Sequence, residues 1–141
     1  MAFKHKLVTV IGGMLVLASS APIAGKGPSA ESIEGAKTIT APEAKALWKQ
    51  GATFIDTRKT SDWEAGRVPG ALHLNVKKLE FNKATILSKI AINDPVISYC
   101  NAEKCHRASA AAKKLVGFGF TNVYYFRKGF PAWKNASYPY E

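Results

Sequence analysis

Two cysteines stand close together in residues 99–107, which read YCNAEKCHR. A cysteine reacts as its thiolate, and an ordinary thiol with a pKa of about 8.5 is only about 3% thiolate at pH 7. Cys100 ends an apolar run and precedes a helical pattern, so backbone N–H groups and the positive end of a helix dipole should face the loop that follows it. Lys104 and Arg107 add positive charge there. We therefore predict that Cys100 is an activated nucleophile.

The cations of this loop conflict with a local rule. Lys104, His106 and Arg107 cluster where a helix should begin, and a cation in the first turn of a helix costs about 0.3–1 kcal/mol. An anion held in the loop, either the thiolate itself or a substrate, resolves the conflict. The alternative interpretation is a buried, inert cysteine with solvated basic neighbours.

The elements that must position this loop alternate along the chain. Strands are predicted at residues 38–40, 53–56, 71–74, 95–99 and 122–126, and helical segments at 42–50, 77–91, 107–116 and around 131–133. This alternation predicts an α/β fold of three layers, with a central, mostly parallel five-stranded sheet and helices on both faces. Ligands bind beyond the carboxyl ends of strands in such sheets, and Cys100 lies at such an end.

The first residues are predicted to be a targeting segment. Lys4 and Lys6 precede a 12-residue apolar run at 7–18, and small residues follow. This order is typical of a secretory signal peptide, and the run is shorter than the about 20 residues that a spanning helix needs. We predict a signal peptide over residues 1–25 with cleavage between 20 and 30, a linker over 26–36 and one domain over 37–141. The mature protein is then periplasmic or secreted, with no stable membrane insertion.

Composition narrows the class of protein. A chain of 141 residues with 47% hydrophobic and 21% charged residues suits one globular domain, which we expect to be monomeric. Two cysteines and three histidines exclude a disulfide scaffold and a four-ligand zinc framework, so no metal and no cofactor are expected. The net charge of +10 indicates an anionic partner, but export and the scattering of the lysines argue against nucleic acid.

Three motifs in order resemble the rhodanese family over nearly the whole mature chain. The family's first signature is an aspartate–x–arginine after a strand, followed by gly–his–ile–pro–gly–ala, and it is similar to residues 54–58 (FIDTR), 62–63 (DW) and 66–71 (GRVPGA). The strand, Cys100, loop and helix resemble the catalytic segment. The closing signature is similar to Gly117-Phe118, Asn122-Val123, Gly129-Phe130 and Trp133.

The resemblance implies a single-domain thiosulfate sulfurtransferase that carries sulfur as a persulfide on Cys100. A small anionic donor such as thiosulfate would supply the sulfur, and a thiophilic acceptor (cyanide, a thiol or a periplasmic thiol protein) would take it. The active loop would be Asn101, Ala102, Glu103, Lys104, Cys105, His106 and Arg107. Its backbone N–H groups would stabilise the persulfide, and Lys104 and Arg107 would attract the donor. Asp56 and Arg58 would support the fold near the site.

The sequence also departs from the family pattern. Arg107 is seven positions after Cys100, where the usual sulfurtransferase has a helix-start residue five positions after its cysteine and phosphatase-like members read C-x5-R. The longer loop predicts a wider pocket or a differently folded turn. Lys128 replaces the first of two glycines expected before Phe130, which predicts an altered turn.

Other readings of the cysteine pair stay open. Cys105 could form a disulfide with Cys100 or act as a resolving thiol, which would make the chain a thiol-redox protein. A haem attachment motif normally reads C-x-x-C-H, two residues shorter than this spacing, and a copper or zinc site would have only three soft ligands. A non-enzymatic sulfur carrier could use the same loop.

Overall fold

The structure is a computed structural model that describes residues 27–141. The predicted signal peptide, residues 1–25, lies outside the described residues. Five strands form one sheet: β1 (Ala36–Thr38), β2 (Thr53–Asp56), β3 (Leu72–His73), β4 (Val96–Tyr99) and β5 (Val123–Phe126). The helices are α1 (Ala41–Lys49), α2 (Thr60–Ala65), α3 (Lys83–Leu87), α4 (Arg107–Gly117) and α5 (Gly129–Asn135).

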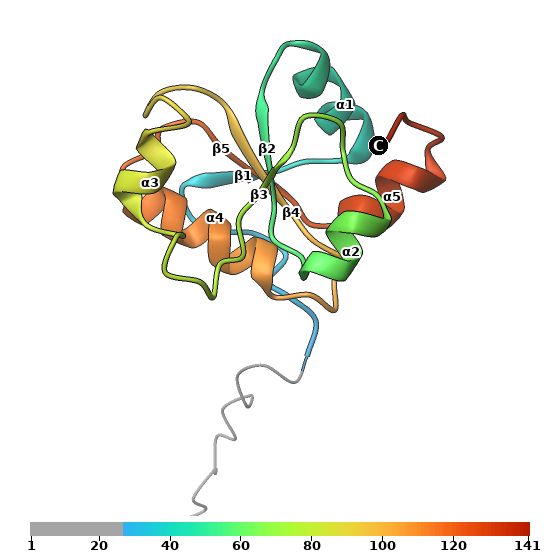
Figure 1. Cartoon of the computed structure of the whole chain (residues 1–141), viewed down its shortest axis with the longest axis horizontal. Helices are drawn as coiled ribbons and strands as arrows, with labels where there is room; N and C mark the ends of the chain where they lie inside the picture. The colour runs from blue at the N-terminus through green and yellow to red at the C-terminus, as the bar shows by residue number, and fades with distance from the viewer. Residues whose placement is uncertain (1–26) are drawn as a thin grey trace, which may run out of the picture.

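All neighbouring strands pair in parallel, in the order β1-β5-β4-β2-β3. Figure 1 shows α3 and α4 on one face of the sheet and α1, α2 and α5 on the other. The two hydrophobic clusters follow this division, since Leu115 of α4 belongs to one cluster and Trp133 of α5 to the other. The predicted three-layer α/β fold with a five-stranded parallel sheet is confirmed.

The central strand β4 is buried at every residue, which explains its continuous apolar sequence. It ends at Tyr99, directly before Cys100, so the predicted nucleophile is attached to the buried central strand of the sheet. The following helix α4 buries three alanines and Leu115 against the sheet, and its N-cap, His106, makes no side-chain capping hydrogen bond. The first-turn N–H groups of α4 therefore have no cap from that side chain.

One predicted helix differs from the observed one, and one observed helix was not predicted. The helical pattern predicted over 77–91 is helical only in α3, because the Asn82 side chain accepts from the Thr85 N–H at 2.9 Å and caps the helix there. Leu79, which we assigned to that pattern, is 94% exposed in a loop. The short helix α2 lacks the apolar periodicity that would have predicted it.

The segment predicted as a linker, residues 26–36, differs as well. Ser29 is buried, and residue 36 already belongs to β1. The segment packs because its backbone carbonyl groups accept hydrogen bonds from side chains of the domain, as described below. Within residues 27–141, every helix is too short and too polar to span a bilayer.

Candidate active site

The site is the loop between β4 and α4, residues 100–106. Cys100 is 2% exposed, and its carbonyl accepts a hydrogen bond from the Phe130 N–H at 2.9 Å. Ala102 adopts a left-handed backbone conformation with φ of 66°, and its carbonyl accepts from the Cys105 N–H at 3.1 Å. The loop therefore turns back on itself and brings the two cysteines together.

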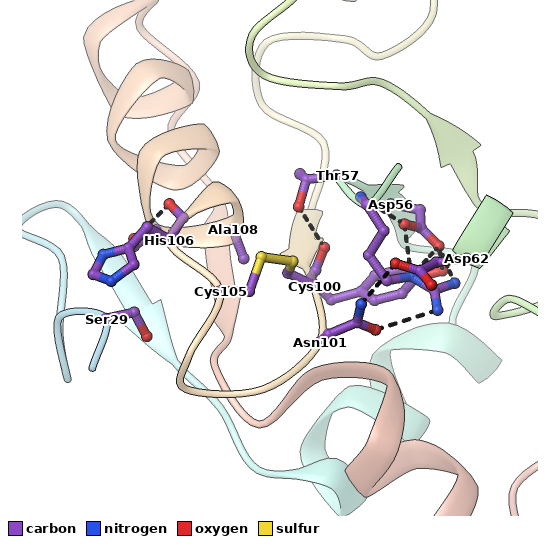
Figure 2. The surroundings of a disulfide bond; sticks show 12 residues. Ser29, Asp56, Thr57, Asp62, Cys100, Asn101, Cys105, His106 and Ala108 are labelled. Carbon is purple, nitrogen blue, oxygen red and sulfur yellow. Dashed lines mark hydrogen bonds and ion pairs between the residues drawn. A yellow bond between two sulfur atoms is a disulfide. The ribbon is translucent and has the colours of Figure 1, made fainter. Parts of the chain in front are cut away.

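Cys100 and Cys105 form a disulfide, with their Cα atoms 6.1 Å apart. Figure 2 shows this bond between the end of β4 and the start of α4. Neither sulfur is a thiolate in this state, so the predicted nucleophile is blocked until the disulfide is reduced. The lengthened loop has a structural consequence, because the extra residues allow Cys105 to reach Cys100 from just before the helix.

The other predicted loop residues surround the disulfide. Asn101, Lys104 and His106 are exposed, whereas Ala102, Glu103 and Arg107 are half-buried. No three His, Cys, Asp or Glu side chains within the described part of the chain lie together in a way that could hold a metal ion.

Asp56 and Arg58 form a buried ion pair next to the loop. The Arg58 Nη2 lies 2.6 Å from Asp56 Oδ2, and Arg58 Nε donates to both carboxylate oxygens. Asp56 Oδ2 also accepts from the Tyr99 hydroxyl at 2.6 Å. Arg58 additionally donates to the Gly66 carbonyl and stacks over the Phe130 ring, with 4.4 Å from its Cζ to the ring centroid. These contacts satisfy the charged groups of the pair within the protein.

Burial and the Asp56 carboxylate shift the pKa values of Arg58 and Tyr99. Burial would lower the pKa of Arg58, but the hydrogen bonds and charge of Asp56 offset it and raise the pKa. Burial, together with the charge of Asp56, raises the pKa of Tyr99 well above its ordinary value. Arg58 therefore stays charged and Tyr99 stays neutral across the physiological range.

Asn101 connects this buried pair to the active loop. Its Nδ2 donates to Asp62 Oδ2 at 2.9 Å, and its Oδ1 accepts from Arg58 Nη1 at 3.5 Å. Thr57 holds the end of the strand from the other side, because its hydroxyl donates to the Tyr99 carbonyl at 2.8 Å. Figure 2 shows Asn101 directed toward Asp62. Asn101, the first residue after Cys100, is thus fixed by Arg58, which follows β2, and by Asp62 of α2.

Comparison with known proteins places the chain in a family. The family model of the rhodanese-like domain matches residues 40–136. The chain belongs to the rhodanese family. The thiosulfate sulfurtransferase GlpE of Pseudomonas savastanoi pv. phaseolicola is 31% identical over 105 residues, which cover 74% of this chain and 92% of that relative. GlpE of Pseudomonas fluorescens is 36% identical over 106 residues, covering 74% and 90%.

A solved structure supports the fold. The human single-domain sulfurtransferase TSTD1 superposes with a TM-score of 0.60 over 71% of this chain and 96% of that chain, at 23% sequence identity. At this identity the likeness concerns the rhodanese fold alone.

A strap formed by residues 27–31 crosses this rhodanese loop, and the sequence did not predict it. The Ser29 N–H donates to the Glu103 carbonyl at 2.7 Å, and His106 Nε2 lies 2.8 Å from the Gly27 carbonyl oxygen. Arg127 donates to the carbonyls of Ser29 at 2.9 Å and Ala30 at 3.1 Å. The Gly, Pro and Ser content of the segment indicated a linker, and no pattern in the sequence indicated these contacts, because the strap makes them with its backbone groups.

The turn before α5 accommodates Lys128 without a positive φ at that residue. Lys128 has φ of −70°, and the positive φ falls on the retained glycine, Gly129, at 60°. A Cβ at Gly129 would meet the Cys100 carbonyl group and lie 3.0 Å from the Ala102 nitrogen. In this turn, only the second of the two positions, Gly129, therefore needs to be glycine.

Proposed function

We propose that this chain is an exported sulfurtransferase of the rhodanese type that moves sulfur from thiosulfate or a related donor through a persulfide on Cys100. The observation that carries the proposal is the place of Cys100 at the carboxyl end of the central strand, at the start of the loop that leads into α4 and that contains Lys104 and His106. Relatives at 31–36% identity that are named thiosulfate sulfurtransferase support the substrate.

The reaction has two displacement steps. The Cys100 thiolate attacks the outer sulfur of thiosulfate, a sulfur–sulfur bond forms at Cys100, and the sulfur–sulfur bond of thiosulfate breaks with release of sulfite. A thiophilic acceptor such as cyanide then attacks the outer sulfur of the persulfide. Thiocyanate leaves, and the Cys100 thiolate is restored with no net change in electrons.

The loop supplies the electrostatics of both steps. Backbone N–H groups of residues 101–105 and the first turn of α4 would hold the negative charge of the thiolate and of the persulfide. Lys104 and Arg107 would attract the dianionic donor. Asp56 and Arg58 act by fixing the end of β2 and, through Asn101, the start of the loop.

The disulfide must open before the first turnover, because it engages the sulfur of Cys100. We expect the reduced protein to gain one sulfur atom on Cys100 after treatment with thiosulfate, seen as an adduct of about 32 Da in the mass spectrum of the Cys100 peptide. The oxidised protein should gain none. A reduced protein that gains no sulfur on Cys100 would refute the proposal.

Two matched variants assign the roles of the cysteines. Cys100→Ser should abolish thiosulfate:cyanide activity, because the hydroxyl is no substitute for the thiolate. Cys105→Ser should retain the activity and lose its dependence on added reductant, because the disulfide no longer forms. Both are measured as thiocyanate produced with and without reductant. The opposite pattern, activity in Cys100→Ser and none in Cys105→Ser, would move the nucleophile to Cys105.

The disulfide itself favours a second candidate, a thiol-redox protein in which Cys105 is the resolving thiol. In that case the pair would exchange electrons with a partner thiol and transfer no sulfur. Titration of free thiols with and without reductant in periplasmic material measures the state of the pair. Two free thiols without reductant would count against the redox function. A chain that binds sulfur on Cys100 without turnover would instead be a carrier.

Export is the remaining part of the proposal. It is supported by the basic, apolar and small-residue order of residues 1–25 and by a disulfide that suits an oxidising compartment. The strap at residues 27–31 favours cleavage before Gly27 within the predicted window, because later cleavage would remove hydrogen bonds to the active loop. Sequencing the N-terminus of the mature protein tests this; a terminus after Gly27 would contradict it.

A further inference from the structure

A basic groove lies beside the disulfide, between the loop after β3 and the N-terminal half of α4, and encloses about 760 Å³. Its lining contains five cationic side chains, which are Lys77, Lys78, Lys104, Arg107 and Lys114. Its lining contains no carboxylate. The two ion pairs of residues 27–141 are Arg58–Asp56 and Arg67–Glu141, so the described part of the chain gives these cations no acidic partner. This arrangement favours an anionic ligand.

The floor of the basic groove is apolar. Val76 and Phe81 are buried there, and Lys114 extends along them with its Nζ 5.9 Å from the Phe81 ring centroid. Leu79 is an exposed apolar residue of the lining. The volume lies within the range of about 300–1,000 Å³ that is common for small-molecule sites. A small organic anion therefore suits the groove better than an inorganic ion.

One sulfur of the disulfide is reachable from this groove. Cys105 lines the groove and is half-buried, whereas Cys100 does not line it and is 2% exposed. Disulfide exchange depends on which sulfur is accessible and on how well the other leaves as a thiolate. The leaving sulfur here is that of Cys100, next to the N-terminus of α4, which favours its negative charge.

We propose that the basic groove binds a small anionic thiol that opens the disulfide by attack on Cys105. The thiolate forms a bond to Cys105 Sγ, the Cys100–Cys105 bond breaks, and its electron pair stays on Cys100 as the thiolate. A second molecule of the thiol attacks the mixed disulfide, which releases the oxidised dimer of the small thiol and leaves a thiolate on Cys105. The two small thiols are oxidised and the protein gains two electrons. This inference rests on the proposed function in one respect only, since it takes the Cys100 thiolate to be the form that reacts with the sulfur donor.

The test compares thiols of different charge on the oxidised full chain. The probes are 2-mercaptoethanesulfonate (anionic), 2-mercaptoethanol (neutral) and cysteamine (cationic), at equal thiolate concentrations and low ionic strength. The rate of disulfide opening is followed by alkylation and mass spectrometry. We expect the anionic thiol to react about tenfold or more faster than the neutral one, with cysteamine slowest, and the preference to fall as salt is added. Equal rates for the three thiols would overturn the proposal.

A triple variant separates the groove from the general charge of the protein. Lys77→Gln, Lys78→Gln and Lys114→Gln together should remove most of the preference for the anionic thiol, because the doubly charged thiolate of 2-mercaptoethanesulfonate loses more attraction than the singly charged thiolate of 2-mercaptoethanol. The control is Lys37→Gln, Lys49→Gln and Lys89→Gln, an equal charge change on exposed residues outside the groove, which should retain the preference. A preference that survives in the first variant, or disappears equally in both, would contradict the groove.

Mapping the trapped intermediate tests the direction of attack. The small thiol should be found on Cys105 and the alkyl label on Cys100; the reverse pattern would overturn the proposed geometry. All these readouts follow disulfide opening and not sulfur transfer. If the chain shows the charge preference but produces no thiocyanate, the proposal for the basic groove stands and the proposed function is refuted. If the chain produces thiocyanate but shows no charge preference, the proposed function stands and the proposal for the groove is refuted.

Discussion

At the carboxyl end of β2, one carboxylate organises the surroundings of the loop. Asp56 accepts hydrogen bonds from Arg58 and from the Tyr99 hydroxyl, and both partners are buried. The Tyr99 hydroxyl in turn accepts from the Val68 N–H at 3.2 Å, so the network reaches the turn before β3. The cost of breaking such a pair comes from the charge that is left buried without a partner.

We expect Asp56→Asn to destabilise the protein by about 3–5 kcal/mol, because Arg58 would stay charged without a counterion. The measurement is the free energy of unfolding in urea. The matched control is Glu141→Gln, which removes the surface partner of Arg67 and should change stability by less than about 1 kcal/mol. Equal, small effects for both variants would show that the buried pair has no special role.

The residues of this network illustrate what sequence can predict at this scale. Asp56 and Arg58 belong to a short motif, so their proximity to each other and to the end of a strand could be expected. The link from Asn101 to Asp62 joins residues 39 positions apart. No local pattern specifies such a contact, because it depends on where the sheet places β2 and α2 relative to β4.

Among the elements, the start of α5 is held directly against the end of β4. Gly129 approaches the carbonyl of Cys100 with a positive φ, and the next N–H, that of Phe130, donates to the same carbonyl. This contact fixes the backbone of Cys100. The packing of α5 and the position of the active loop are therefore coupled.

We expect Gly129→Ala to reduce stability by more than the about 1–2 kcal/mol that a left-handed conformation costs an L-residue, because its Cβ would also collide with the Cys100 carbonyl. Sulfurtransferase activity should fall with it. The control is Gly117→Ala at the end of α4, where a Cβ meets nothing within 4 Å, and it should stabilise by about 0.4–1 kcal/mol. Urea unfolding of both variants checks this, and an undisturbed Gly129→Ala protein would contradict the coupling.

The strap, residues 27–31, is a second element that bears on the loop. We expect Arg127→Gln to loosen it, because hydrogen bonds from a charged donor to two strap carbonyls are lost and such bonds contribute about 1.5–3 kcal/mol. Hydrogen exchange of the Ser29 amide, which donates to Glu103, should accelerate about tenfold or more. Lys128→Gln, at the exposed neighbour, should leave this exchange rate unchanged. Equal exchange in both variants would mean that Arg127 does not hold the strap.

Strands β2, β4 and β5 were predictable as apolar runs bounded by turns, whereas β1 lies at Ala36–Thr38, two residues before the strand predicted at 38–40. The strap and the region of residues 77–91 were not predictable. The strap is ordered by hydrogen bonds to its backbone, which carry no side-chain signature, and the helix of the second region starts late because Asn82 caps it. The basic groove could not be predicted from the sequence either, because Lys77 and Lys78 come to line the same groove as Lys114 only in the folded chain.

On the scale of the whole molecule, the disulfide is a second source of stability beside the core. A covalent link across a separation of five residues stabilises by about 2 kcal/mol in the chain-entropy account. Reduction should therefore lower the Tm of the wild-type protein by several degrees, as scanning calorimetry would record. The Tm of Cys105→Ser should not respond to reductant. An identical Tm for oxidised and reduced wild type would contradict this.

The contacts of the strap and of the disulfide differ greatly in their separation along the chain. The cysteines are five residues apart, whereas Tyr125 and Arg127 meet the strap across 96 and 98 residues. Because closing a long loop costs more entropy than closing a short one, we expect the cysteine pair to join early during folding and the strap to dock last. A newly folded molecule in an oxidising compartment would then emerge with its nucleophile already shielded. A sulfurtransferase of this kind would be latent, and its supply of reductant would set when it begins to work.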